Sequence, residues 1–312
     1  LNCREIGFQA FIRQQNMTNV TFGSGVKVIG KDADEGQTFY DCDDLTGVRI
    51  QDPENIWYYS FQYCDSITGV YIGNNTENTD GYVGPHAFRD LGTTAQGGAG
   101  NGHAYIGSSI NKLDTLAFYG DRYWIYSADI NCEEIGYRCF EDQRNLKELT
   151  LSSGVKTIGS RAFYNNYALT GIRITDPVFI DQYAFQYTQN LSGVYIGNDT
   201  ENTQGIIADN GGRYIGLNVV NQGYLYIGSS INSIGSNSFY GDNASYQWLK
   251  KADINCKTIG KQAFYNQDNL TEVNLGENVW DIKQQAFHEC DGRTGLRIPN
   301  PKWLNNQAFE QC

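Results

Sequence analysis

The sequence repeats itself with a period of about 22 residues, and this constrains the fold more than any other feature. The segment 146–168, LKELTLSSGVKTIGSRAFYNNYA, opens with spaced leucines, passes a glycine-containing turn and ends in an Ala-Phe pair followed by polar residues. The following segments start again at Leu169 with LTGIRI and at Leu191 with LSGVYI. A fixed period in this range is typical of stacked repeats, in which each coil buries its apolar edge against its neighbours.

The phenylalanine of the Ala-Phe pair gives the register. Successive spacings are mostly 22 or 23 residues, as from Phe140 to Phe163 and from Phe163 to Phe185. The longer gap from Phe185 to Phe239 predicts one coil with a degenerate corner, near Tyr214. We therefore expect about thirteen coils of ~22–30 residues, the first without its strand, in a single domain over residues 1–312.

Each coil contains a strand-like triplet whose outer residues are apolar, as in Val20 and Phe22, Val48 and Ile50, or Ala104 and Ile106. Alternation places these two residues on one face and the residue between them on the other. The sequence thus predicts one parallel strand per coil, with the apolar side chains sharing a continuous core.

A longer period lies above the first. LNCREIG at position 1, INCEEIG at 130 and INCKTIG at 254 correspond, and VYIGNNTENT at 70 recurs as VYIGNDTENT at 194. A block of five coils is therefore copied about two and a half times. Two insertions rich in Gly and Asn, 74–102 and 198–223, recur with the block, and we expect them to be loops at one edge of the stack. Because the chain begins and ends in mid-pattern, we expect it to be a fragment of a longer protein.

The pattern LTxVxI…VxxIGxxAFxxC, carried by GVKTIGSRAFYNN, NVWDIKQQAFHEC and LTGVRIQDPENIWYYSFQYC, resembles the BspA-like (Treponema pallidum-type) leucine-rich repeats over essentially the whole chain. The resemblance implies a leucine-rich-repeat solenoid, a β-rich α/β fold with parallel strands on the concave face. Family members are surface or secreted proteins of host-associated bacteria and some protists, and several are associated with adhesion. The motif positions are core positions, so the resemblance transfers no binding residues.

Composition and motifs exclude several classes of function. The formal net charge of −12 argues against nucleic acid as a partner, and no 18-residue apolar run is present to insert into a membrane. His86, His103 and His288 lie in separate coils without metal-ligand spacing, and no nucleophile or phosphate-binding motif occurs. We predict no enzymatic activity, no metal and no cofactor.

The eight cysteines leave two interpretations open. Cys42 and Cys64, like Cys290 and Cys312, occupy equivalent corners of successive coils, close enough in a stack for a disulfide. The interpretation that we favour is a set of buried free thiols acting as small apolar side chains.

The middle residues of the strand triplets form the candidate site. Arginine and tyrosine on a rigid sheet are residue types that anchor protein interfaces, although block duplication or a stacking ladder would also produce such a series. The predicted ligand-binding residues are Arg49, Tyr71, Tyr105, Asp129, Arg173, Tyr195, Tyr226, Asp253 and Arg297.

The sequence favours a cell-surface or secreted, non-catalytic binding module, an adhesin that contacts a host or extracellular-matrix protein or a glycan. The concave face and the two insertions are its candidate contact surfaces. The alternative is a structural spacer that displays another domain.

Overall fold

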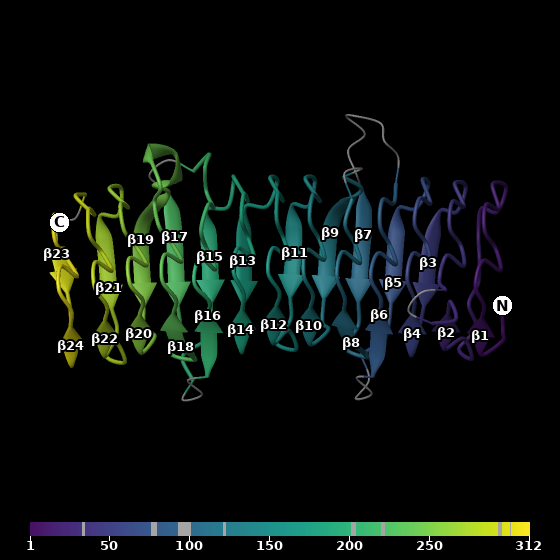
Figure 1. Cartoon of the computed structure of the whole chain (residues 1–312), viewed down its shortest axis with the longest axis horizontal. Helices are drawn as coiled ribbons and strands as arrows, with labels where there is room; N and C mark the ends of the chain where they lie inside the picture. The colour runs from purple at the N-terminus through teal and green to yellow at the C-terminus, as the bar shows by residue number, and fades with distance from the viewer. Residues whose placement is uncertain are drawn as a thin grey trace. The chain divides into compact units, whose positions relative to one another are not determined.

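The computed structural model describes residues 1–32, 35–75, 80–92, 101–120, 123–200, 204–219, 222–292, 295–299 and 301–312, except for the side chains at 244 and 295–297. These residues form two compact units, Leu1–Val155 and Lys156–Cys312. In both units a complete coil consists of a first strand, a turn, a second strand and a corner (Figure 1). A single domain over residues 1–312 stays a prediction.

In the first unit all strand pairs are parallel, and successive coils supply neighbouring strands (Figure 1). The first strands pair in the order β11-β9-β7-β5-β3 and the second strands in the order β1-β2-β4-β6-β8-β10. The first strands are β3 Gly47–Ile50, β5 Gly69–Ile72, β7 Gly102–Ile106, β9 Ile125–Ile130 and β11 Glu148–Leu151. The second strands are β1 Glu5–Ile6, β2 Val28–Ile29, β4 Asn55–Ile56, β6 Gly81–Val83, β8 Ile110–Leu113 and β10 Glu134–Ile135.

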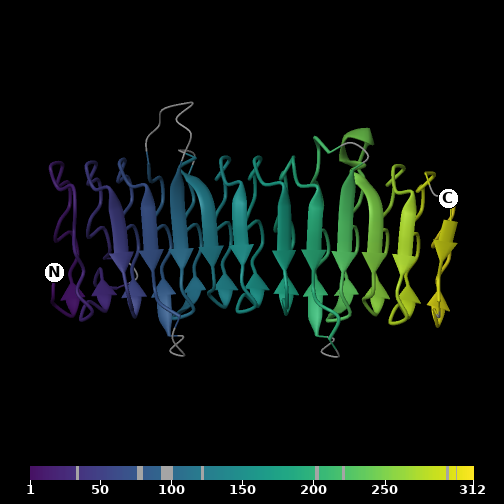
Figure 2. The same ribbon diagram turned by 180° about the vertical axis from the view of Figure 1, so that it is seen from behind.

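The second unit follows the same plan, as seen from behind in Figure 2, with the first strands in the order β13-β15-β17-β19-β21-β23. Its first strands are β13 Gly171–Ile174, β15 Gly193–Ile196, β17 Gly223–Ile227, β19 Leu249–Ile254, β21 Glu272–Leu275 and β23 Gly295–Arg297. Its second strands are β12 Thr157–Ile158, β14 Phe179–Ile180, β16 Gly205–Ile207, β18 Ile231–Ile234, β20 Thr258–Ile259, β22 Asp281–Ile282 and β24 Trp303–Leu304.

The strands carry the five-coil period in their lengths. From β3 to β11 the first strands have 4, 4, 5, 6 and 4 residues, and from β13 to β21 the same series recurs. Within the described residues, thirteen coils have a second strand and eleven also have a first strand.

The prediction that the segment of Val20 and Phe22 forms a strand is wrong. Its backbone makes only isolated hydrogen bonds to neighbouring coils, from Gly23 N–H to Leu1 O and from Thr46 N–H to Thr18 O, instead of a ladder.

The core is built as the alternation predicts. Val48 and Ile50 are buried on either side of the exposed Arg49. From β5 to β21 the residues that flank the middle position are buried too, except Leu149 of β11, which is half-buried. Behind the strands the corner phenylalanines stack ring on ring. Their centroids are 5.0 Å apart for Phe39 and Phe61 and 4.9 Å apart for Phe264 and Phe287. This distance matches the spacing of neighbouring strands, so each coil adds one ring to the stack.

Most corners turn without a helix because two of their residues are left-handed, two before and two after the phenylalanine. At the corners of Phe118 and Phe239 only the first of the two is left-handed. Around Phe264, Gln262 has φ 54° and Asn266 has φ 56°, a conformation that breaks a right-handed helix. The N–H of Phe264 instead donates to the carbonyl of Ala286 in the next coil, at 2.7 Å. The predicted solenoid is confirmed, while the helical share of the described residues is the three-residue 3-10 turn η1, Ala244–Tyr246.

The coil with the degenerate corner is where the sequence predicts it. Asn210 and Tyr214 keep the two left-handed positions, with φ 58° and 62°, but Gly212 stands in place of the phenylalanine. The ring of Phe239 fills the space: a Cβ built on Gly212 would lie 2.4 Å from its Cε1.

The two insertions are only partly loops. The range 74–102 contains β6 and a complete corner around Phe88, and 198–223 contains β16 and the corner of Gly212. Tyr82-Val83 and Ile206-Ile207 pair with strands on both sides, which makes these segments part of the stack. Residues 76–79, 93–100, 201–203, 220 and 221 lie outside the described part.

Candidate functional site

The outward middle residues of the first strands face one another in register and form what we name the first-strand column. In the first unit Arg49 is paired with Tyr71, Tyr71 with Tyr105, and Tyr105 with Asp129. The structure therefore brings together the four residues that the sequence predicts there.

The second unit repeats this arrangement, with Arg173 paired with Tyr195, Tyr195 with Tyr226, and Tyr226 with Asp253. The backbone of Arg297 pairs with Asn274, but the side chain of Arg297 lies outside the described part.

In the first unit the column is an aromatic row between a cation and an anion. The guanidinium of Arg49 lies 4.4 Å from the ring centroid of Tyr71, which in turn stacks on Tyr105 at 6.5 Å. His103 lies beside the row: its Nδ1 is 2.8 Å from Ser127 Oγ and its Nε2 is 3.7 Å from Asp129 Oδ2. The tyrosines are half-buried and Arg49 is exposed, so the row offers an arginine and the edges of aromatic rings to a partner.

In the second unit the same row carries more hydrogen bonds. Arg173 lies 4.4 Å from the centroid of Tyr195, and Tyr195 is 6.3 Å from Tyr226. Tyr224 replaces His103, and its hydroxyl donates to Asp253 Oδ2 at 2.6 Å. The phenol of Tyr224 has its pKa raised by burial and then by this carboxylate, which keeps it a donor at neutral pH.

Asp199 completes the second-unit site, and sequence reasoning missed it. The hydroxyl of Tyr226 donates to its Oδ2 at 2.5 Å, and Ser229 N–H and Asn255 Nδ2 reach its Oδ1 at 3.3 and 3.5 Å. Foremost because of the Tyr226 bond, the pKa of Asp199 is lowered. Burial and the Asp199 carboxylate raise the pKa of Tyr226 to about 12.

The corresponding residue of the first unit is Asn75, so the two copies differ here in charge. Its Oδ1 accepts from Ser108 N–H at 3.3 Å and from Asn131 Nδ2 at 3.2 Å, the same structural contacts that Asp199 makes. A signal for Asp199 was present in the sequence: VYIGNNTENT and VYIGNDTENT differ only at this position.

These groups enclose an open pocket of about 350 Å³ in the second unit. Its lining joins column residues to the turn that follows β15, so the strand face and the turn act as one surface. The lining residues are Arg173, Thr175, Tyr195, Gly197, Asn198, Asp199 and Tyr226.

The glycines beside the column differ in how much free space lies above them. A Cβ on Gly69 would lie 3.0 Å from the ring of Tyr71, so the tyrosine covers that position. At Gly171 the nearest atom to such a Cβ is the carbonyl oxygen of Gly193, at 3.7 Å. Close approach by a partner is therefore possible next to Arg173, while the glycine before Tyr71 provides room for the ring itself.

The cysteines are free thiols, as the favoured interpretation predicts, and six of the eight are buried, Cys3 and Cys312 being exposed. The corner thiols are not merely apolar: Cys64 Sγ–H donates to Phe39 O at 3.1 Å, and Cys290 Sγ–H to Phe264 O at 3.1 Å. Burial raises the pKa of the Cys64 thiol, which favours the protonated donor.

Among the described residues no group of three or more His, Cys, Asp or Glu side chains is placed to hold a metal ion. The pKa of His86 is lowered to about 4, first by burial and then by Arg89. In the described part, no helix has both the length and the apolar character that crossing a bilayer requires.

Parallel strands stacked coil on coil, with repeating leucine or isoleucine positions in the core, define a leucine-rich-repeat solenoid. The family model "BspA type Leucine rich repeat region" matches residues 1–93, 102–206 and 217–312 in six copies. The chain belongs to this family.

Three solved structures of leucine-rich repeat proteins resemble this chain. A leucine-rich cell surface protein from Faecalibacterium prausnitzii A2-165 is 19% identical, with a TM-score of 0.43 over 96% of this chain and 76% of that one. A leucine-rich repeat protein from Bacteroides ovatus ATCC 8483 is 17% identical, with a TM-score of 0.38 over 95% and 75% of the two chains. One from Eubacterium ventriosum ATCC 27560 is 16% identical, with a TM-score of 0.35 over 93% and 81%. No curated protein matches the sequence.

Proposed function

We propose that this chain is a non-catalytic binding module, displayed at a cell surface or secreted, that acts in adhesion. Its partner is an extracellular protein or glycan, bound through the first-strand column of the second unit. The observation that carries the proposal is the pocket in which Arg173, Tyr195 and Tyr226 meet the Asp199 carboxylate. Resemblance to BspA-like surface proteins supports the location.

The chemistry of this pocket suits recognition. The exposed guanidinium of an arginine above a tyrosine supplies a positive charge and five hydrogen-bond donors, and it is only weakly hydrated before binding. The edges of the tyrosine rings supply apolar contact at low entropic cost. Asp199 and the half-buried phenols add acceptors and donors in fixed positions, because each is already held by a hydrogen bond.

One observation favours the structural spacer as a second candidate. The column residues are held by one another and by their neighbours: Arg173 lies over Tyr195, Tyr226 donates to Asp199, and Tyr224 donates to Asp253. A ladder that stiffens the sheet needs the same contacts.

The double variant Arg173→Ala/Tyr195→Ala separates the two functions. We expect it to lose about tenfold or more in affinity for the ligand found by screening an array of extracellular-matrix proteins and glycans, because arginine and tyrosine dominate interfaces of this kind. Its melting temperature should change by only a few degrees. The matched control is Arg49→Ala/Tyr71→Ala, which removes the same 4.4 Å contact where Asn75 replaces the carboxylate. If no ligand were found on the array, the spacer would be favoured, and unchanged affinity in Arg173→Ala/Tyr195→Ala would contradict binding through this column.

A further inference from the structure

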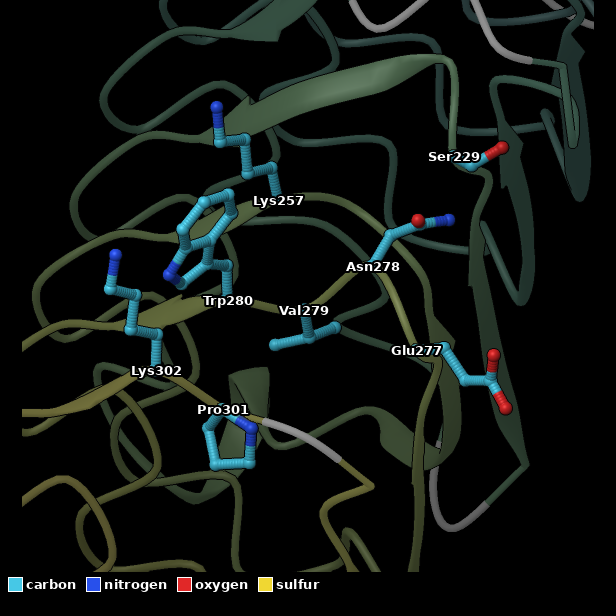
Figure 3. A pocket seen from close by; sticks show the side chains of 8 residues that line it. All are labelled: Ser229, Lys257, Glu277, Asn278, Val279, Trp280, Pro301 and Lys302. Carbon is cyan, nitrogen blue, oxygen red and sulfur yellow. The ribbon is translucent and has the colours of Figure 1, made fainter.

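A second pocket of the second unit, of about 580 Å³, lies beside the turns that lead into its second strands (Figure 3). Lys257 precedes β20, Trp280 precedes β22 and Lys302 precedes β24, so these three side chains come from three successive coils. Asn278, Glu277 and Ser229 line the remaining wall. We name it the Trp280 pocket.

Trp280 stands between two lysines. The residue is 41% exposed, and the ammonium groups of Lys257 and Lys302 lie 5.2 and 4.8 Å from its ring centroid. Neither ammonium has an ion-pair partner among the described residues, whereas Lys283 nearby is paired with Asp281 at 2.6 Å. In a chain of net charge −12, two unpaired cations beside an exposed indole form a local anion-attracting site.

The internal copies show that this site is a departure from the block. At the position of Trp280 the two earlier copies have Lys27 and Lys156. These lysines are neutralised by Asp52 at 2.5 Å and by Asp176 at 2.7 Å. In the third copy the lysine has become tryptophan, and the sequence has asparagine where the two aspartates stand.

The two positions that flank Trp280 also differ between the copies, and in the third copy both are lysine. Lys302 corresponds to Glu54 and Val178, and Lys257 to Arg4 and Glu133. In the first copy these two positions form an ion pair, Arg4 to Glu54 at 2.7 Å. The third copy has two lysines instead, so a surface of paired charges has become a cationic one with an aromatic centre.

We propose that the Trp280 pocket binds an anionic saccharide, a sugar unit that carries a carboxylate or sulfate group. The two ammonium groups match the acidic group, and the exposed part of the indole matches the apolar C–H face of a sugar ring. The Asn278 amide and the Glu277 carboxylate match its hydroxyls as donor and acceptor. The volume falls in the range of pockets for small ligands.

One side chain, Asn255, connects the Trp280 pocket to the pocket lined by Arg173 and Asp199. Asn255 accepts from Asn278 N–H and Nδ2 at 3.3 Å and donates to Asp199 Oδ1 at 3.5 Å. The saccharide proposal nevertheless stands on its own residues. A Tyr195→Ala variant should bind the saccharide as the parent does, which separates failure of one proposal from failure of the other.

The test is titration calorimetry at constant salt with a glucuronate-containing tetrasaccharide, a sulfated tetrasaccharide, the methyl ester of the first and a tetraglutamate peptide. We expect the chain to bind at least one anionic saccharide, with the ester and the peptide binding more weakly by about tenfold or more.

The variants Trp280→Lys and Lys257→Glu/Lys302→Val should each bind the saccharide more weakly by about tenfold or more. All three substitutions install residues that other copies of the block already carry there, so the fold should tolerate them. The control Lys250→Glu changes charge on an exposed residue outside the pocket and should stay within about twofold.

Three results would overturn the proposal. The first is no binding of either anionic saccharide, and the second is equal binding of the ester or of tetraglutamate. The third is unchanged affinity in Trp280→Lys, since that variant adds a cation and removes only the indole.

Discussion

His86 is held in its neutral form by the packing of its corner. Its ring lies 5.0 Å from the ring of Tyr59 and 5.3 Å from that of Tyr58, and its Nδ1 is buried with no hydrogen-bond partner among the described residues. Burial, and then the positive charge of Arg89, lowers its pKa to about 4. The unfolded chain, with an ordinary histidine pKa near 6.5, therefore takes up this proton at a higher pH than the folded chain.

The consequence is a loss of stability on acidification. Because the folded pKa is depressed, this group favours unfolding increasingly as the pH falls from about 6.5 towards about 4. We predict that His86→Asn, which suits the left-handed φ of 56°, loses less free energy of unfolding between pH 7 and pH 5 than the parent does. Denaturant titrations at the two pH values measure this, and parallel losses in both proteins would refute the account.

Gly212 stands where other corners have a phenylalanine, and the ring of Phe239 occupies the space that a side chain at 212 would need. A Cβ there would lie 2.4 Å from Phe239 Cε1 and 2.8 Å from its Cδ1, and Phe239 is buried. We predict that Gly212→Ala destabilises the fold by about 1–3 kcal/mol, the usual cost of overpacking a core. Gly171→Ala is the matched control because its Cβ would meet nothing closer than 3.7 Å. Equal melting temperatures for the two variants would show that Phe239 moves aside without cost.

Six of the described corners also bind the coil before them through one side chain, three residues after the phenylalanine. Cys64 and Cys290 do this with a thiol, and Gln267 with an amide whose Nε2 donates to Phe239 O at 2.9 Å. Gln267 is fully buried and makes two further backbone contacts, to Tyr246 O at 3.1 Å and from Leu249 N–H at 3.3 Å. In these corners the position supplies a hydrogen-bond donor, whereas Leu91 and Ile215 fill it with an apolar side chain.

We predict that Gln267→Ala costs about 2–4 kcal/mol because two buried backbone groups and one half-buried carbonyl lose this partner. Gln267→Cys should cost less, since a thiol there can repeat the bond that Cys290 makes to Phe264 O. The order of melting temperatures, parent above Gln267→Cys above Gln267→Ala, tests the idea. If alanine were as stable as cysteine, the thiol bonds would be incidental.

The sequence predicted those elements that repeat in every coil. Alternation around Arg49 or Tyr195 identifies the buried face because a strand has a period of two, and the Phe spacing locates the corner of Gly212 even where the phenylalanine is lost. It did not show the shared donor role of Cys64 and Gln267, since a side chain's partner is set by the neighbouring coil. Val20 and Phe22 misled for the same reason: alternation specifies a face, while a strand also needs a partner ladder.

The candidate site, too, could be predicted from the sequence only in part. Register alone aligns Arg173, Tyr195 and Tyr226, so the alternation of the strands was enough to predict this row. Asp199 joins it only because the turn after β15 brings a carboxylate back over the strand face, and no periodicity encodes the path of a turn. The Trp280 pocket required comparison of the copies together with knowledge of which lysines are paired.

At the scale of the whole chain, stability should be local, because the energy of a repeat array is a sum of terms within coils and between neighbours. Phe264→Ala removes a ring that lies 5.4 Å from Phe239 and 4.9 Å from Phe287, a loss of about 3–5 kcal/mol. We predict faster amide hydrogen exchange in β18, β20 and β22 and unchanged exchange in β3, β5 and β7, measured by mass spectrometry under native conditions. Phe61→Ala, whose ring lies 5.0 Å from both Phe39 and Phe88, should give the reverse pattern. If either variant accelerated exchange equally in all of these strands, the chain would unfold as one cooperative body and the nearest-neighbour account would be wrong.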